Sequence, residues 1–564
     1  MAIPEVSAER RRRLTHRALP ALAALAFLSA GAGMVVGAGQ TSVEQRTARE
    51  FARAWARQDY RAMYAKLDAA SRRAYSFAEF RNAYRDAIAT ATIDTINADD
   101  PGRRHDGLVT VPIRLHTRVF GRIRADLELP LHGTEVTWGP VLAYPGLHRG
   151  EALSRRSRPP RRATLLSRDG KVLARGPADD RSSPLEAIAG SIAGTLQPQE
   201  TAEERRLLYS HGFPPDWPVG QNGLEEAFES RLAGRPGGTL LAGTRAIARA
   251  NPRPAQPVRT TIDTRLQEAA VTALAGRFGG VAALDPHNGE IRALAGIAFS
   301  APQPPGSTFK IVTTAAALEA KAVKPTTEFP IASAATIDGV QLQNANGEYC
   351  GGTFRNSFAH SCNSVFAPLG VKIGAQALVD AAERFGWNST PTVPGEIPST
   401  LPPATEIDTP LEVGSTAIGQ FRTLATPLEM ASVAQTIASH GVRHRPTLTP
   451  GDSRRSVRVI RRKIARTIQS LMIDVVAYGT GTAAALPGVK VAGKTGTAEL
   501  EDTKRDPETG EPIDQSDPSN TDAWFTAYAP AAKPRIVVAV MLVRAGAGGA
   551  TAAPAARVVL DAAL

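Results

Sequence analysis

The sequence predicts an α+β protein built of several domains. Its 564 residues, of which 43% are hydrophobic, are enough to bury more than one core. Between Ala48 and Leu67 apolar residues recur at helical spacing, and runs of alternating polarity follow at 108–115 and 127–131. Helices followed by strands within one segment are typical of a small α+β domain. We therefore expect such a domain over residues 41–147.

The N-terminus predicts a membrane anchor. Several arginines within residues 1–17 precede residues 18–39, which carry no charge and are long enough to span a bilayer. The basic flank predicts that residues 1–17 lie in the cytoplasm and that the rest of a single-pass chain lies outside the plasma membrane. A cleaved signal peptide is the alternative, because small residues follow the apolar run. The length of that run favours an anchor that is kept.

The net charge of +12 raises the question of an anionic partner. Nucleic acid is not expected, because the chain is predicted to face outward and its aromatic residues, 5% of the total, do not interleave with the basic ones. An anionic wall polymer is compatible with this charge. A composition biased toward Ala and Arg accounts for most of it.

Two further segments follow the first domain. Residues 150–252 are expected to form a linker domain, and residues 255–564 the largest one. Asp169-Gly170 stands between apolar runs and predicts the turn of a β-hairpin. Stretches rich in Arg and Pro at 155–162 and 250–257 are interpreted as linkers on either side of this middle segment.

The first of three short motifs in the third segment is Ser307-Thr308-Phe309-Lys310, which opens a helical run. Ser307 is therefore expected near a helix N-terminus, with Lys310 one turn away on the same face. A serine hydroxyl becomes a nucleophile when a nearby base takes its proton. Lysine is such a base where burial and cationic neighbours favour its neutral form. Taken alone, an ordinary helix start with a solvated lysine explains the motif equally well.

The second motif is Ser361-Cys362-Asn363. Its functional interpretation makes Ser361 a proton relay and Asn363 an amide that positions the substrate backbone. In isolation, a polar turn before a helix over residues 364–373 explains this motif better. Its place between the other two motifs is what favours the functional interpretation.

The third motif is Lys494-Thr495-Gly496-Thr497, and the alternation of Val489 and Val491 before it predicts a strand. On an edge strand, both threonine hydroxyls are placed to hold a substrate carboxylate beside Lys494, while Gly496 lets the substrate backbone approach. Lys494 is also the cationic neighbour that favours neutral Lys310. The backbone N–H groups of Ser307 and Thr497 then form an oxyanion hole, which contributes about 3 kcal/mol per donor.

A nucleotide-binding loop is the rival interpretation, because residues 488–495 match the pattern GxxxxGK[ST]. Such a loop needs a strand before its first Gly and a helix after its Thr. Here Pro487 precedes the first Gly, and an acidic segment that contains proline, residues 501–520, follows the motif. Nucleotide binding is therefore not expected, and the acidic segment is interpreted as a solvated loop.

The three motifs, in this order, resemble the signature of serine acyl-transferases that penicillin inactivates. Residues 255–564 resemble the transpeptidase domain of class B penicillin-binding proteins. Shorter stretches that add to the likeness are Thr260–Gln267, Gly280–Ile291, Ile418-Gly419-Gln420, Thr426-Pro427-Leu428 and Ala523-Trp524-Phe525. Phe421 departs from the pattern, since many relatives carry Gly there, and this leaves the flexibility of its loop open.

The resemblance implies a mixed sheet flanked by helices and a reaction without a cofactor. It also implies that a D-Ala-D-Ala stem peptide, or a β-lactam, acylates Ser307, and that the peptide is then transferred to the amine of a neighbouring peptide. Residues 41–147 are similar to the NTF2-like N-terminal domain of some penicillin-binding proteins. Residues 161–174 resemble the start of the class B linker or dimerisation region. No glycosyltransferase-like region is seen, so a separate peptidoglycan glycosyltransferase is a candidate partner.

Cys350 and Cys362 are the only cysteines, and on an outward-facing protein they are candidates for a disulfide that braces the second motif. Two buried thiols are the alternative, because sequence does not give the distance between the two Cα atoms. His440 and His444 are four residues apart, but no third ligand is evident and no metal site is predicted.

The expected function is that of a membrane-anchored peptidoglycan D,D-transpeptidase. A D,D-carboxypeptidase or a β-lactamase of the same superfamily is one alternative, and the length and accessory domains argue against the β-lactamase. A wall-synthesis scaffold or sensor that is acylated without turnover is another, and the complete motifs argue against it. The motifs do not distinguish a role in elongation from one in division.

Overall fold

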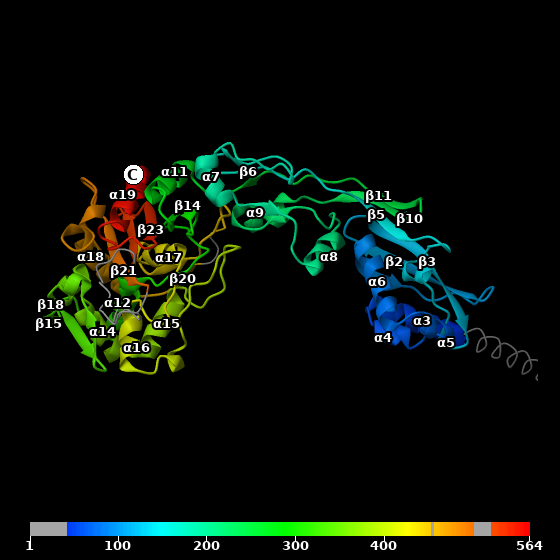
Figure 1. Cartoon of the computed structure of the whole chain (residues 1–564), viewed down its shortest axis with the longest axis horizontal. Coiled ribbons are helices and arrows are strands. Elements are labelled where there is room, and N and C mark those ends of the chain that lie inside the picture. Colours follow the sequence, from blue (N-terminus) through cyan, green and yellow to red (C-terminus); the bar gives the residue numbers. More distant parts are fainter. Residues whose placement is uncertain (1–41, 453–455, 501–519) are drawn as a thin grey trace, which may run out of the picture. The chain divides into compact units, whose positions relative to one another are not determined.

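The computed structural model describes residues 42–452, 456–500 and 520–564 (Figure 1). The predicted anchor at residues 18–39 and most of the acidic segment lie outside these described residues. Contacts divide the chain into two units. One contains residues up to 159 together with 200–216 and 235–253, and the other contains 160–199, 217–234 and 254–564. The middle segment of the sequence is therefore shared between both units.

The first unit begins with helices and continues with an antiparallel sheet, which confirms the α+β prediction. Its helices are α3 (Val43–Ala56), α4 (Tyr60–Tyr64), α5 (Ala69–Ala74) and α6 (Phe77–Ala91), and its strands β1 (Ile93–Ala98), β2 (Leu108–Thr117), β3 (Gly121–His132) and β4 (Glu135–Val136). Ser42 and Ser76 begin α3 and α6 with capping boxes. Phe51, Trp55 and Trp138 fill the core between helices and sheet.

Residues 155–158, the first part of the stretch interpreted as a linker, instead lie in strand β5 (Leu153–Arg158). This strand pairs with β10 (Gly237–Ala242), which also pairs with β11 (Arg245–Ala250). Leu153 and Leu240 bury side chains in the core of the first unit, and helix α8 (Ala202–Ser210) belongs to the same unit. The alternation of half-buried and exposed residues in β5 is hard to recognise in the sequence, because arginines occupy both kinds of position. A long arginine stem can pack against the core while its charged end stays in solvent.

The second unit begins with short elements around a buried ion-pair network. They are β6 (Leu165–Leu166), β7 (Val172–Ala174), α7 (Glu186–Ala193), β8 (Leu196–Gln197), β9 (Val219–Gly220), α9 (Gly223–Ala227), α10 (Glu229–Leu232) and β12 (Val258–Arg259). The turn at Asp169-Gly170 joins β6 and β7 as an antiparallel hairpin, as predicted. Arg162 is buried and donates to the carboxylates of Glu225 and Glu229, which satisfies charges that would otherwise destabilise this core.

A five-stranded sheet organises the rest of the second unit. Its order is β14 (Ile291–Gly296), β13 (Gly279–Leu284), β23 (Ile536–Leu542), β22 (Thr521–Ala529) and β21 (Ala492–Glu499), and every pairing is antiparallel. The implied mixed sheet is therefore wrong in this detail. Strands β21, β22 and β23 follow one another in the chain and pair as neighbours, each antiparallel to the one before it.

Helices cover both faces of this sheet. Helices α11 (Thr264–Leu274) and α19 (Ala552–Ala563) pack on one face with Val281, Ala283 and Phe525. Helices α12 (Lys310–Glu319), α17 (Pro427–Ala438) and α18 (Arg462–Ala477) pack with Ala282 and Trp524 on the other. Alternate residues of one strand thus enter two different cores.

The remaining elements surround this helix layer. They are α13 (Phe354–Ala359), α14 (Asn363–Ile373), α15 (Ala375–Phe385), α16 (Pro410–Ala417), β15 (Glu328–Ala332), β16 (Ala334–Ile337), β17 (Val340–Gln343), β18 (Cys350–Thr353), β19 (Val442–His444) and β20 (Ser456–Arg458). Within the described ranges, no single helix is long and apolar enough to cross a bilayer, although the bent pair α14 and α15 meets that test together.

Candidate active site

Ser307 lies in a short 3₁₀ helix, Gly306–Phe309, which runs directly into α12 at Lys310. In a 3₁₀ helix the side chains at positions i and i+3 eclipse each other, so Ser307 and Lys310 occupy the same edge. Ser307 is half-buried, whereas Lys310 is fully buried. The sequence expectation of a serine at a helix start with a lysine one turn later matches this arrangement.

The ammonium group of Lys310 reaches the second motif. Its Nζ donates to the backbone oxygen of Ser361 at 2.7 Å, to Asn363 Oδ1 at 2.6 Å and to Ser361 Oγ at 3.3 Å. Ser361 has φ of +61°, a left-handed conformation that is uncommon for a residue with a side chain. This backbone geometry lets the carbonyl and the hydroxyl of one residue face the same lysine.

Lys494 donates to the same hydroxyl. It lies on β21, the edge strand of the sheet, and its Nζ donates to Ser361 Oγ at 2.8 Å. Lys494 is fully buried, and burial lowers the pKa of its ammonium group to about 7. Burial, reinforced by the positive charge of Lys494, also holds the pKa of Lys310 well below its ordinary value. Two buried lysines that share one serine hydroxyl therefore favour a neutral amine, which is the form a general base requires.

The strand begins later than the sequence suggested. Val489 and Val491 precede it, and β21 starts at Ala492 and carries the third motif itself. The sequence interpretation assigned Val489 and Val491 to the strand, but these two residues only lead into it. The third motif lies within a strand that continues to Glu499, so no helix directly follows Thr495 and the context that a nucleotide-binding loop requires is missing.

Close backbone contacts hold β21 against the segment that carries Ser307. A Cβ atom on Gly306 would lie 2.6 Å from the carbonyl oxygen of Thr497, and one on Gly496 would lie 2.8 Å from that of Pro305. Gly306 also donates its N–H to the carbonyl of Gly419 at 3.0 Å. Side chains at these glycines would force the two segments apart, so the approach of Thr497 to Ser307 depends on them.

The structure adds Thr480 and Gly548 to the predicted site. The hydroxyls of Thr480 and Thr495 share a hydrogen bond, and Gly548 donates its N–H to Thr497 Oγ1 at 3.3 Å. Sequence reasoning missed both residues. The glycine-rich runs Gly479-Thr480-Gly481 and Gly546–Gly549 were the available signal, but without the fold neither run indicates a partner.

The disulfide candidate lies directly beside the second motif. Cys350 on β18 and Cys362, the residue before α14, are bonded through their sulfur atoms, and their Cα atoms are 5.6 Å apart. Both residues are buried. Because Cys362 separates Ser361 from Asn363, the bond ties the loop that presents both polar groups to a neighbouring strand.

The other candidate groups do not join this site. His440 lies between α17 and β19, and His444 is the last residue of β19. The described residues hold no group of three or more His, Cys, Asp or Glu side chains suited to a metal ion. Phe421 has φ of +62° and a side chain that is 37% exposed. That left-handed conformation favours glycine, and glycine is the residue expected at this position from the family pattern.

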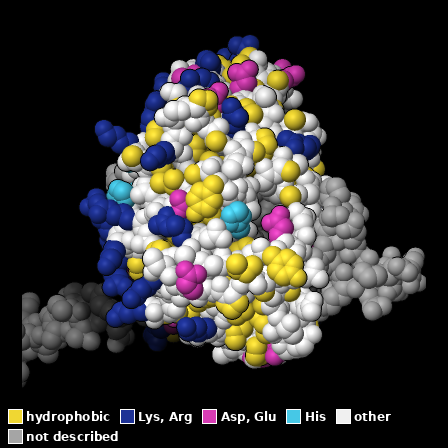
Figure 2. Space-filling view, turned by 90° about the vertical axis from the view of Figure 1, so that its left-hand side faces the viewer, with side chains coloured by type: hydrophobic (Ala, Val, Ile, Leu, Met, Phe, Trp, Pro, Cys, Tyr) yellow, Lys and Arg dark blue, Asp and Glu magenta, His cyan; other side chains and the backbone are white. Residues whose placement is uncertain are grey.

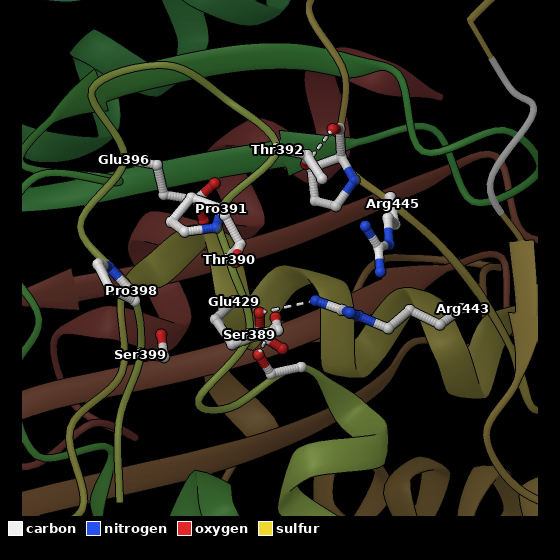
Figure 3. Close-up of a pocket in the computed structure, with 12 residues that line it drawn as sticks. Ser389, Thr390, Pro391, Thr392, Glu396, Pro398, Ser399, Glu429, Arg443 and Arg445 are labelled. Atoms are coloured by element: carbon white, nitrogen blue, oxygen red, sulfur yellow. Dashed lines mark hydrogen bonds and ion pairs between the residues drawn. The ribbon is translucent and has the colours of Figure 1, made fainter.

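A separate pocket contains a second buried charge cluster (Figure 3). Glu429 on α17 forms an ion pair of 3.0 Å with Arg443, and Glu396 lines the same pocket. Burial raises the pKa of each carboxyl group to about 7, and the charge of Glu429 contributes to the shift of Glu396. Ser399, at the same pocket, accepts the N–H of Thr426, the residue that caps α17. The cluster thus fastens residues 389–399 to the start of that helix.

Replacing Glu396 with glutamine is expected to stabilise the protein at high pH only. The folded-state pKa lies above the unfolded value, so the folded state binds more protons and its stability falls as pH rises from about 4.5 to about 7. Thermal unfolding of Glu396→Gln should therefore match the wild type at pH 4.5 and occur at a higher temperature at pH 8. Glu348→Gln, which changes an exposed carboxylate, is the control. An equal rise in unfolding temperature at pH 8 in both variants would contradict the raised pKa of Glu396.

Comparison with known proteins identifies two family matches. Residues 279–561 match the penicillin binding protein transpeptidase domain, and residues 44–151 match the NTF2-like N-terminal transpeptidase domain. The peptidoglycan D,D-transpeptidase PbpA of Mycobacterium tuberculosis is 36% identical over 378 residues, which cover 54% of this chain and 72% of that protein.

Solved structures agree with these matches. The D,D-transpeptidase domain of a peptidoglycan glycosyltransferase from Eggerthella lenta has 29% identity and a TM-score of 0.57. Penicillin-binding protein A from M. tuberculosis, as a ceftriaxone acyl-enzyme complex, has 27% identity and a TM-score of 0.57. Each comparison covers 72% of this chain and 98% of the other chain. Because the transpeptidase model spans half of the sequence and carries all three motifs, the chain belongs to the penicillin-binding protein transpeptidases.

Proposed function

We propose that the protein is a peptidoglycan D,D-transpeptidase that works outside the plasma membrane, to which residues 18–39 anchor it. The observation that carries the catalytic part is the sharing of Ser361 Oγ between two buried lysines next to Ser307. The relatives support the substrate class, since PbpA of M. tuberculosis is a peptidoglycan D,D-transpeptidase and its structures include acyl-enzyme complexes with β-lactams. The uncharged length and the basic flank of residues 18–39 support the anchor.

In the proposed reaction, Ser307 Oγ attacks the carbonyl carbon of the penultimate D-Ala, and neutral Lys310 accepts the hydroxyl proton. The backbone N–H groups of Ser307 and Thr497 stabilise the negative charge on the carbonyl oxygen. The C–N bond then breaks, and the terminal D-Ala leaves with a proton passed on through Ser361. The amine of a second stem peptide attacks the resulting ester, and Ser307 recovers its proton when the new peptide bond forms.

The third motif sets the position of the donor peptide. Lys494 and the hydroxyls of Thr495 and Thr497 lie along the edge strand, where they suit the terminal carboxylate of D-Ala-D-Ala or the carboxylate of a β-lactam. Thr480 supports Thr495 through their shared hydrogen bond. Asn363, held by Lys310 and by its own bond to the carbonyl of Gln343 at 2.6 Å, is rigidly placed to meet the substrate backbone.

Covalent labelling by a fluorescent penicillin is expected for the wild type and not for Ser307→Ala. Losing the nucleophile removes the only proposed acylation step, so labelling should fall below detection while the thermal unfolding profile is retained. Ser364→Ala, which changes the neighbouring hydroxyl on α14, is the control and should keep its labelling. Equal labelling of wild type and Ser307→Ala would place the nucleophile elsewhere.

The same protein, given stem peptides and an acceptor amine, should then produce cross-linked peptide and one free D-Ala for each cross-link. Release of D-Ala without cross-linked product would identify a D,D-carboxypeptidase instead. Labelling without either product would identify a protein that is acylated but does not turn over.

A further inference from the structure

A basic groove runs along the first turns of α18. The residues of α18 that line it are Arg462, Lys463, Arg466, Thr467 and Ser470, and the opposite wall includes Arg355 and Pro325. The groove has a volume of about 560 Å³. Figure 2 views the second unit from the side on which α18 is labelled in Figure 1, and Lys and Arg side chains gather along one edge of that face.

The cations of this groove are not balanced by local carboxylates. Residues 456–466 contain five basic residues and no acidic one, and all five are exposed. Among the described residues, Arg462, Lys463 and Arg466 form no ion pair, whereas Arg355 is paired with Asp474 and donates to Ser470. The groove thus presents three free cations beside one that is already neutralised.

These cations do not serve the helix that carries them. The N-terminus of a helix favours acidic side chains because of the helix dipole, yet the first turn of α18 has no acidic residue and its capping position, Arg461, provides no side-chain hydrogen bond. By contrast, α3, α6, α8 and α16 each begin with a capping box. The basic residues of α18 are unfavourable for the isolated helix, which favours a role toward an external anion.

The shape and lining of the groove select among anions. Arg462 and Arg466 are four residues apart, which places them about 6 Å from each other along the helix. A polymer with regularly spaced negative charges contacts several such cations at once, and a single small anion does not. Among the described residues, no aromatic side chain lines the groove, so the bases of a nucleic acid would find no stacking surface there. A flat membrane surface does not enter a groove.

We propose that this groove binds a linear phosphodiester polymer that lacks bases, of the poly(glycerol phosphate) type. The guanidinium groups of Arg462 and Arg466 suit phosphate oxygens, because each presents paired N–H donors. The groove belongs to the same domain as the active site, because α18 packs against α13, which leads into Ser361, and against β21, which carries Lys494. Binding of an anionic wall polymer here holds the transpeptidase domain at the wall independently of its donor peptide.

Binding of fluorescent poly(glycerol phosphate) to the full-length protein, measured by anisotropy over a series of salt concentrations, tests this proposal. The variant Arg462→Gln/Lys463→Gln/Arg466→Gln should weaken binding about tenfold or more and reduce the slope of log K against log salt by about 2. The matched control is Arg265→Gln/Lys533→Gln/Arg557→Gln. It removes the same charge from exposed positions on α11, before β23 and on α19, respectively. It should leave both quantities close to the wild type.

Penicillin labelling provides a check on folding, because the groove residues lie outside the proposed catalytic groups, and all variants should label at the wild-type rate. Three results would overturn the proposal. The first is equal weakening by both triple variants, which would show a response to net charge alone. The second is that the wild-type protein binds oligo(dT) of matched charge as tightly as it binds the polymer. The third is binding to vesicles of anionic phospholipid without binding to the polymer.

Discussion

Replacing Lys310 with methionine is expected to lower the rate of acylation by benzylpenicillin by about 10³-fold, within the range that general bases contribute. Lys310 is fully buried, lies on the same edge of the 3₁₀ helix as Ser307 and is held by Ser361 and Asn363. Methionine preserves the length and the apolar packing of the stem but cannot accept a proton. Stopped-flow acylation under single-turnover conditions measures the loss.

Lys490→Met is the matched control for this substitution. Lys490 is exposed and precedes Lys494 by four residues, so its loss removes the same charge near the same strand without touching the proton path. An acylation rate in Lys310→Met that equals that of Lys490→Met would show that another group is the base.

The pH profile gives the same experiment a second readout. Wild-type acylation should rise with pH as Lys310, whose pKa is lowered by burial and by Lys494, loses its proton. Lys494→Met removes the neighbouring positive charge, so the pKa of Lys310 should increase and the rise in acylation should move to higher pH. Because the two lysines share one hydroxyl, the measured midpoints belong to the pair. A profile that stays in place in Lys494→Met would contradict the proposed coupling.

The proposed catalytic groups were found in the sequence because each motif is local. Ser307 and Lys310 are three residues apart, and helical geometry alone places them on one edge. Spacing does not reveal that Lys310 and Lys494 meet at Ser361, which depends on β21 lying at the edge of the sheet beside the 3₁₀ helix. The order of the motifs indicated a site, and the fold supplied the contacts within it.

Other features escaped prediction for reasons of long-range packing. Strand β5 follows the first domain in sequence, but it pairs with β10, which begins about 80 residues later. The local sequence of β5 does not indicate which distant strand it pairs with. Thr480 likewise becomes part of the site only because α18 ends beside β21. The all-antiparallel sheet differs from the mixed one implied by resemblance because strand direction is a property of the connections, not of the motifs.

Gly419 is expected to be among the least replaceable residues outside the motifs. It has φ of +77°, and a Cβ atom there would lie 2.1 Å from the carbonyl oxygen of Gly306 and 2.9 Å from Cβ of Phe309. Gly306 donates its N–H to the carbonyl of Gly419 and directly precedes Ser307, the proposed nucleophile. Alanine at position 419 must therefore push the segment that carries Ser307, and a displacement of about 1 Å at a reacting group lowers a rate by about 10²-fold.

Gly339→Ala separates this clash from ordinary backbone strain. Gly339 has the same φ of +77° but nothing within 4 Å of its Cβ position, so alanine there meets only the cost of the left-handed conformation, about 1–2 kcal/mol. We expect both variants to unfold at lower temperature than the wild type, Gly419→Ala by more, and only Gly419→Ala to lose about 10²-fold in benzylpenicillin acylation. If Gly419→Ala, still folded, acylates as fast as Gly339→Ala, the contact between residues 306 and 419 does not position Ser307. If it is slow, that backbone contact is as much a part of the site as the lysines, because it fixes the distance over which they act.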